Sequence, residues 1–179
     1  IQTCISYAAD GAIITVPAGS FSGSFSLSGT KALNIIGAGI DLTTTSGTVT
    51  MTTSGTKLIR IAGFTFSSGK IYVGGTGTRW RIDHNKFTGS SGPNIQVDGT
   101  TYGVIDHNQW TGAVRSCIWV FQNSWHNGGD GGRQSWITAA PLGTANAVFI
   151  EDNTFTFSQA SPGVGAVDAR SGERLVFRY

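Results

Sequence analysis

Hydrophobic and polar positions recur along the chain in blocks of one design. Each clear block starts with an isoleucine, has an asparagine three positions later and an aromatic residue five positions later. The clear copies span 82–87, 105–110 and 150–155, and weaker copies span 61–66 and 35–40. The anchor isoleucines lie 26, 21, 23 and 45 residues apart, so the last interval contains either a further coil or a large inserted loop.

A second set of segments alternates apolar and polar residues, which is the pattern of a half-buried strand. Its members are 71–73, 95–97, 118–120 and 165–167, and they keep step with the first set. A Gly-Thr or Gly-x turn precedes each anchor strand, and glycine there permits the positive φ of a sharp corner. These glycines are Gly29, Gly55, Gly77, Gly99 and Gly143.

The two sets together predict an all-β fold, a parallel β-helix (solenoid) that forms one domain over 1–179. Its coils would have about 22 residues and stack about 4.8 Å apart, the spacing of hydrogen-bonded strands. Residues one period apart then form columns. The predicted columns are an isoleucine stack (Ile61, Ile82, Ile105, Ile150), an aromatic stack (Phe66, Phe87, Trp110, Phe155) and an asparagine ladder (Asn85, Asn108, Asn153, with Asn123 as a further candidate). A sandwich or propeller would also have short strands, but it would not require equal coil lengths with matched side chains.

The opening segment 10–19 (DGAIITVPAG) resembles the first coil of right-handed parallel β-helix proteins of the pectate-lyase-like group. The Ile-x-x-Asn-x-Phe blocks are similar to the repeats of the same group, so the resemblance covers nearly the whole chain. It implies a right-handed coil and a function among polysaccharide lyases and hydrolases, phage and viral tailspikes, or surface adhesins. The lyases of the group typically pair a calcium-binding carboxylate cluster with a catalytic Arg or Lys, and no such set can be transferred residue by residue.

Composition and charge exclude several other classes. Gly, Thr and Ser number 26, 22 and 18 of 179 residues, against only 6 Leu and 2 Glu, which excludes a mainly helical protein. The net charge of +2 comes without a basic run, so no nucleic-acid partner is expected. No apolar stretch approaches the roughly 18 residues of a transmembrane segment. The weakly charged, Thr/Ser/Gly-rich surface favours an exported protein, secreted or at the cell surface.

Stacking has consequences for the cysteines and for the end of the chain. Cys4 and Cys117 lie four or more coils apart, roughly 20 Å at the strand spacing, which is too far for a disulfide between them. The chain stops at Tyr179, directly after 175–178 has begun another strand. A solenoid ended there exposes apolar surface and unpaired backbone groups, so we expect more protein beyond Tyr179 or another chain that caps this end.

Three acidic residues, Asp83, Asp106 and Glu151, share the position after the anchor isoleucine and are expected to point outward. Like charges in neighbouring coils repel, so this column needs compensation. A calcium ion bound by the three carboxylates would supply it. Ion pairs with Arg60 and Arg81, which stack just before the anchor, would supply it too and are the commoner arrangement.

His84 and His107 share the next position of the repeat, and Asp152 follows them in the same column. Stacked histidines could bind a transition metal or act as acid or base, but two ligands from adjacent coils do not make a closed site. An ordinary role in the turn is the simpler interpretation.

The regular pattern stops around 123–141, where dense glycine predicts an inserted loop or irregular coil. Trp125, His126, Asp130, Arg133 and Trp136 lie within it. Aromatic faces can stack on sugar rings, and Asp and Arg add directional hydrogen bonds. We therefore expect substrate binding by the two tryptophans and the histidine, with the Asp and the Arg as catalytic candidates. The alternative is a loop that packs its tryptophans on the neighbouring coil.

Trp119 is the outward residue of its strand and could extend this binding surface. Asp168 and Arg170 follow the strand 165–167, and Asp98 takes the equivalent place after Val97. A carboxylate beside a guanidinium could act as base and charge stabiliser in the β-elimination of a uronate, which makes Asp168 and Arg170 further catalytic candidates. A surface ion pair accounts for them more simply.

These observations favour an exported β-helix protein that binds or degrades polysaccharide in a lyase-like or hydrolase-like groove. An enzyme of this kind would be a polysaccharide lyase or a glycoside hydrolase, its partner a glycan, and the only cofactor suggested is calcium. The alternative is a non-catalytic structural or adhesive protein of a cell surface, filament or phage tail. Fold alone does not decide between them, because function belongs to sites placed on folds.

Overall fold

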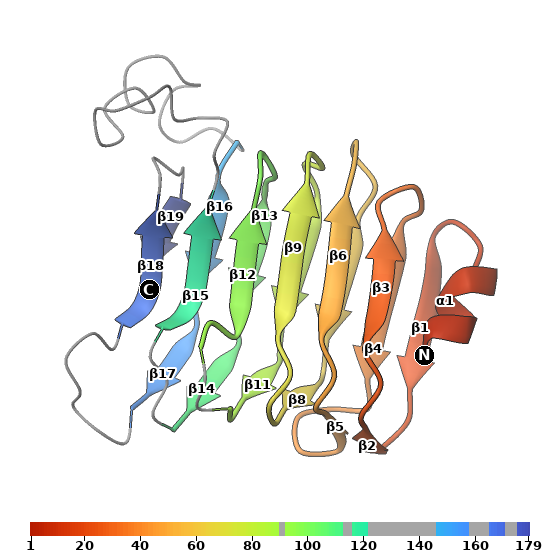
Figure 1. Ribbon diagram of the computed structural model, residues 1–179, viewed down its shortest axis with the longest axis horizontal. Helices are drawn as coiled ribbons and strands as arrows, with labels where there is room; N and C mark the ends of the chain where they lie inside the picture. Colours follow the sequence, from red (N-terminus) through yellow and green to blue (C-terminus); the bar gives the residue numbers. More distant parts are fainter. Residues whose placement is uncertain (90–91, 113–115, 122–145, 158–164, 171–174) are drawn as a thin grey trace.

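The computed structural model describes residues 1–89, 92–112, 116–121, 146–157, 165–170 and 175–179. It confirms a parallel β-helix in which successive coils add strands to three parallel sheets, here named A, B and C (Figure 1). Sheet A contains β1 (Ala12–Val16), β4 (Leu33–Gly37), β7 (Ile59–Ala62), β10 (Trp80–Asp83), β13 (Gly103–Asp106), β16 (Val148–Glu151) and β19 (Leu175–Arg178). Sheet B contains β2 (Gly19–Phe21), β5 (Thr43–Thr45), β8 (Thr65–Phe66), β11 (Lys86–Phe87), β14 (Gln109–Thr111) and β17 (Thr154–Thr156). Sheet C contains β3 (Phe25–Ser28), β6 (Val49–Thr53), β9 (Ile71–Gly75), β12 (Ile95–Asp98), β15 (Ser116–Phe121) and β18 (Gly165–Arg170).

The interior is built from columns of like residues, as the repeat predicts. Ile61, Ile82, Ile105 and Ile150 are paired in register along sheet A and are fully buried. In sheet B the rings of Phe66, Phe87, Trp110 and Phe155 stack with centroids 5.0, 4.8 and 4.7 Å apart. In-register partners of sheet C from Phe25 to Ile118 are 22 to 24 residues apart, so a coil is slightly longer than predicted.

The asparagine ladder is also present at the corner between sheets A and B. The amide nitrogen Nδ2 of Asn85 donates to the carbonyls of Ile61 and Asp83 and to Oδ1 of Asn108, at 3.1, 2.9 and 3.1 Å. Asn108 repeats the arrangement toward Ile82, Asp106 and Asn153. The ladder therefore bonds three successive coils to one another, while Asn123 lies outside the described residues.

The 45-residue interval between Ile105 and Ile150 contains an insertion and not a further coil. Ile105 of β13 pairs directly with Ile150 of β16, and β14 pairs with β17 in the same way. The coils on either side of 122–145 are therefore neighbours, and no further coil separates them.

Two registers differ from the sequence prediction. In sheet C, Val167 pairs with Ile118 and Ala169 pairs with Val120, so β18 is shifted by two residues from the predicted alignment of 165–167 with 118–120. In sheet B, the residue in register with Phe66 is Thr45 and not Ile40, because residues 38–42 extend the corner of that coil. The shift in sheet C, being of two residues, preserves the alternation of inward and outward side chains.

The corner glycines serve two purposes, where the sequence suggested one. Gly55 and Gly99 have positive φ values of 56° and 103°, as predicted. Gly29 and Gly77 do not, but a Cβ on either would lie 2.2 and 2.7 Å from the backbone nitrogen of Ser54. Those two glycines are required by the close approach of neighbouring coils. Gly143 lies outside the described residues.

One short helix, α1 (Gln2–Tyr7), was not predicted, and it lies at the N-terminal end of the solenoid (Figure 1). Its Ile5 is buried, and the Gln2 side chain bonds to the edge of sheet C. Oε1 of Gln2 accepts the backbone N–H of Ser26 at 2.7 Å, and Nε2 donates to the Ser26 carbonyl at 3.4 Å. The side-chain amide thus replaces part of the next strand at this edge.

The two cysteines have different surroundings and are both free. Cys4 is exposed in α1, whereas Cys117 is fully buried in β15. Burial raises the pKa of the Cys117 thiol to about 12, which makes it a core residue without thiolate character.

Candidate functional site

The outer face of sheet C brings together aromatic, amide and acidic side chains from separate coils. Tyr72, Gln96, Trp119 and Asp168 are successive in-register residues of β9, β12, β15 and β18. All four are half-buried, so each residue retains an exposed part. We call these four residues the sheet C column.

A second column, two residues further along the strands, completes this face. It contains Gly74, Asp98 and Phe121 in register. The hydroxyl of Tyr72 donates to Oδ2 of Asp98 at 3.0 Å, which is a diagonal contact from one coil to the next. Gly74 leaves room for this contact, since a Cβ there would lie 3.2 Å from Cε1 of the Tyr72 ring. Burial and the bond to Asp98 raise the pKa of Tyr72.

Trp119 and Phe121 form the aromatic centre of the face. Their rings are 5.9 Å apart in an edge-to-face arrangement with an interplanar angle of 65°. In the shifted register of β18, Asp168 pairs with Trp119. A predicted catalytic residue, Asp168, therefore lies beside a predicted binding residue, Trp119. Arg170 is in register with Phe121, and Phe121 is in register with Asp98, so Arg170 and Asp98 share a column. The sequence prediction had placed Asp168, and not Arg170, in the column of Asp98.

The acidic column of sheet A is held by arginines. Nε and Nη2 of Arg60 donate to the two carboxylate oxygens of Asp83 at 2.6 and 2.5 Å. Arg81 bonds to Asp106 in the same way, at 2.8 and 2.5 Å. The third acid, Glu151, accepts from Nε of Arg178 at 2.9 Å.

Two of the three carboxylates, which were expected to point outward, are covered by neighbouring side chains. The side chain of Asp83 has no exposed surface and that of Asp106 has 6%. Burial by itself would raise the pKa of Asp106, but the bonds from Arg81 and His107 outweigh it and lower the pKa. The same arginines and histidines that bond to these two carboxylates also compensate their negative charge.

Of the two interpretations of this column, the structure shows the ion pairs. Both oxygens of Asp83 and of Asp106 accept from a guanidinium, so a calcium ion would have to compete with that bidentate contact. In the described part of the chain, no group of three or more His, Cys, Asp or Glu side chains is arranged to hold a metal ion.

His84 and His107 lie at the same corner, immediately after β10 and β13. Both have a left-handed backbone, with φ of 53° and 54°, and Asp152 has φ of 51° at the equivalent position. Their rings are stacked 5.0 Å apart. The predicted role in the turn is therefore present, together with a side-chain arrangement that the sequence did not indicate.

Five of the predicted site residues cannot be placed on either face. Trp125, His126, Asp130, Arg133 and Trp136 lie in 122–145, outside the described residues, and the side chain of Arg170 is likewise not described. In the sequence, the segment that contains the five follows directly after Phe121, the last residue of β15.

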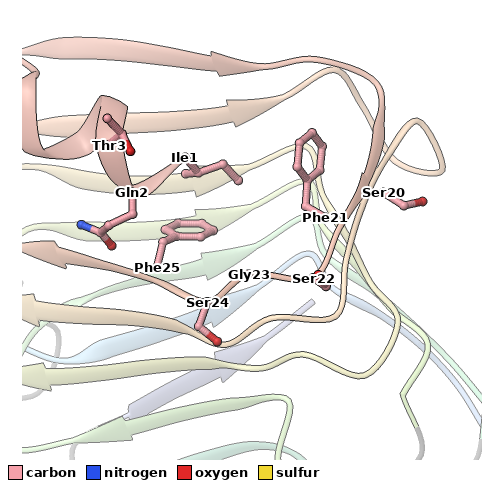
Figure 2. Close-up of a pocket in the computed structure, with 9 residues that line it drawn as sticks. All are labelled: Ile1, Gln2, Thr3, Ser20, Phe21, Ser22, Gly23, Ser24 and Phe25. Atoms are coloured by element: carbon pink, nitrogen blue, oxygen red, sulfur yellow. The ribbon is translucent and has the colours of Figure 1, made fainter.

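A hollow of about 440 Å³ lies at the N-terminal end, between α1 and the corner from β2 to β3 (Figure 2). Its walls include Ser20, Ser22 and Ser24 with Phe21 and Phe25, and no Asp, Glu, Lys, Arg or His side chain lines it. None of the predicted site residues contributes to it, and its side chains are hydroxyl, amide, aliphatic and aromatic groups.

Two residues of the sheet C column, Tyr72 and Gln96, were not predicted as site residues, although the sequence pattern could have identified them. Tyr72 and Gln96 are the middle residues of the alternating segments 71–73 and 95–97, and in both the flanking residues are buried. Reading the middle position down the repeats would have placed Tyr72, Gln96 and Trp119 in one outward column.

No helix in the described ranges has the length and apolar character to span a membrane. Comparison of the chain with protein-family models, with curated proteins and with solved structures found no significant match. What the structure shows is a parallel β-solenoid with a mixed aromatic and acidic outer face on sheet C.

Proposed function

We propose that this chain is an exported β-helix protein that binds polysaccharide along the outer face of sheet C. The observation that carries the proposal is the sheet C column, in which Tyr72, Gln96, Trp119 and Asp168 follow one another at the strand spacing of about 4.8 Å. A polymer laid along the solenoid axis would meet a side chain of this column at every coil.

The chemistry of the face suits sugars. Trp119 and Tyr72 offer apolar ring surface for stacking against the faces of sugar rings. Gln96, Asp98 and Asp168 add hydrogen-bonding groups beside these rings, and such groups fix the orientation of a ligand.

The wider proposal includes the resemblance to pectate-lyase-like β-helix proteins and a location outside the cell. The stacked phenylalanine and tryptophan rings and the asparagine ladder support the resemblance at the level of architecture. Cleavage would require an acid and a base beside the bound glycan, and the candidates are Asp168 with Asp130, Arg133 and Arg170.

The proposal is tested by measuring binding to a panel of neutral and acidic polysaccharides with the intact chain. We expect Trp119→Ala and Gln96→Ala to weaken binding at least tenfold, since each removes a contact from the sheet C column. Tyr7→Ala is the matched aromatic control, because Tyr7 is 88% exposed in α1 and lies outside the column. Trp125→Ala and Trp136→Ala measure the contribution of the inserted segment.

Circular dichroism and the melting temperature of each variant separate lost contact from lost fold. The same panel, followed by absorbance of unsaturated products and by reducing ends, detects lyase and hydrolase activity. Binding that survives Trp119→Ala and Gln96→Ala in folded protein would place the glycan elsewhere, and absence of binding across the panel would contradict the proposal.

A second function, as a structural or adhesive element, is favoured by one observation. Five acidic side chains of the described residues, Asp10, Asp41, Asp83, Asp106 and Glu151, are bonded to lysines or arginines of other coils and so stabilise the solenoid. Under this alternative, the protein would bind no glycan and would associate end to end, which sedimentation analysis at increasing concentration would detect.

A further inference from the structure

The two aromatic residues of the sheet C column lie in alternate coils. Tyr72 of β9 and Trp119 of β15 are both in register with Gln96 of β12, and the three strands lie side by side (Figure 1). Two strand spacings therefore separate the aromatic positions, about 9.6 Å along the solenoid axis. A ligand laid along the axis would meet a ring, an amide and a second ring.

The ring of Tyr72 lies along the surface of its own strand. Its Cε1 and Cζ atoms are 3.2 and 3.8 Å from the point that a Cβ on Gly74 would occupy. Its hydroxyl donates to Oδ2 of Asp98 at 3.0 Å, which holds the far end of the ring. Because Tyr72 is half-buried in this position, one ring face is turned to the sheet and the other to solvent.

Gly74 is what makes room for this ring, and the backbone does not explain why the position is glycine. Its φ is not positive, and the residues in register with it in the two adjacent coils are Thr52 and Asp98. Glycine in the interior of a strand weakens the strand and often marks the close approach of a ligand. Gly74 and Tyr72 together therefore form a flat, exposed platform on β9.

Trp119 offers a second apolar surface. Its Nε1 atom is buried although the residue as a whole is half-buried, so the exposed part of the side chain is hydrocarbon. The ring of Phe121 contacts it edge to face at 5.9 Å. Such a surface suits stacking against the C–H face of a sugar ring.

We propose that the sheet C column binds a β-1,4-linked glycan of the cellulose, mannan or chitin type. Tyr72 and Trp119 stack on two sugars that are separated by one, and Gln96 bonds to the sugar between them. This inference rests on the proposed polysaccharide binding and adds the linkage of the polymer.

The linkage follows from the spacing of the two rings. In an extended β-1,4-linked chain, successive sugar rings are turned over, so every second ring presents the same face. This disaccharide repeat is close to two strand spacings. An α-1,4-linked chain curves, and its sugar rings do not return to the same orientation at that interval.

The test compares hexasaccharides of different linkage by calorimetric titration of the intact chain. Cellohexaose and maltohexaose contain the same sugar in β-1,4 and α-1,4 linkage, and mannohexaose and chitohexaose complete the β-1,4 set. We expect at least one β-1,4-linked hexamer to bind at least tenfold more tightly than maltohexaose. In that series the largest gain should come from the disaccharide to the trisaccharide, because three sugars reach from Tyr72 to Trp119.

A variant with a displaced ring tests the spacing itself. The double substitution Tyr72→Ala with Gln96→Tyr keeps two aromatic residues in the column but places them in adjacent coils. We expect it to weaken binding of the β-1,4-linked hexamer at least tenfold. Tyr7→Ala, outside the column, should leave the affinity unchanged, and equal melting temperatures of the variants and the parent exclude loss of fold.

The outcomes distinguish this inference from the broader proposal. Maltohexaose that binds as tightly as the best β-1,4-linked hexamer, or unchanged affinity in the displaced-ring variant, would overturn the inference and leave polysaccharide binding in place. The same holds if a polysaccharide of the wider panel binds while none of the four hexamers does. Absence of binding across the whole panel would contradict both.

Discussion

Single polar side chains bond from one coil to the next in this protein, and this is how they stabilise it. Asn85 and Asn108 each donate to two backbone carbonyls and to the next asparagine of the ladder. Arg60, Arg81 and Tyr72 reach diagonally to an acid in the following coil. Each of these side chains satisfies groups that a fully buried corner or a crowded outer face would otherwise leave without partners.

Replacing Asn108 by alanine tests this role in the ladder. The change removes the donor to Ile82 and Asp106 and the acceptor of the Asn85 backbone N–H, all buried. A buried group left without its partner costs about 1–3 kcal/mol, so we expect the free energy of unfolding to fall by at least about 2 kcal/mol. Urea denaturation measures it.

The control is Asn146→Ala, since Asn146 is exposed just before β16. Equal stability of the two variants would show that the ladder contributes nothing beyond the cost of an ordinary surface substitution.

Adjacent strands approach so closely that some positions accept only glycine. Gly103 begins β13, and the ring of the fully buried Trp80 in β10 lies against it, with Nε1 bonded to Thr101 at 2.9 Å. A Cβ on Gly103 would lie 2.2 Å from Cδ2 of Trp80 and 2.5 Å from its carbonyl oxygen. Thr101, Trp80 and Gly103 therefore form one packed unit.

The substitution Gly103→Ala should lower the free energy of unfolding by about 2–3 kcal/mol, because overpacking typically costs 1–3 and here the clash includes backbone. Gly23→Ala is the matched control, since a Cβ there meets nothing within 4 Å and should change stability by less than about 0.5 kcal/mol. Thermal or urea unfolding measures both variants, and an equal free energy of unfolding for the two would contradict the prediction.

The whole molecule is a one-dimensional stack whose stability depends on contacts between neighbouring coils. Strands β4 to β16 in sheet A have a paired neighbour on both sides, whereas β1 and β19 have one. The N-terminal edge of sheet C is also bonded by Gln2 of α1. At the other end, Phe177 and Tyr179 have 51% and 84% of their surface exposed.

Hydrogen exchange followed by mass spectrometry should therefore give unequal protection along the chain. We expect the slowest exchange in β7 to β12, which are paired on both sides, and faster exchange in β17 to β19. Uniform protection from end to end would mean that the solenoid opens as a single cooperative unit.

Part of the candidate site could be predicted from residue types one period apart, and part could not. Ile82 and Ile105, or Asn85 and Asn108, meet because equal coil lengths bring equal positions together. The register of β18 could not be obtained in this way, since a shift of two residues preserves the alternation of inward and outward side chains. That shift is what places Asp168 beside Trp119.

The periodic pattern by itself determined the parallel β-helix, its inner columns and its asparagine ladder, because each of these depends only on spacing along the chain. The sequence offered ion pairs with Arg60 and Arg81 as one of two interpretations of the acidic column, and the tertiary structure decided between them and set the partner of each outward side chain. The contacts of Arg60 with Asp83 and of Tyr72 with Asp98 are diagonal, and the burial of Asp83 follows from groups of two coils. Such contacts depend on the offset and twist between neighbouring strands, which residue spacing does not specify.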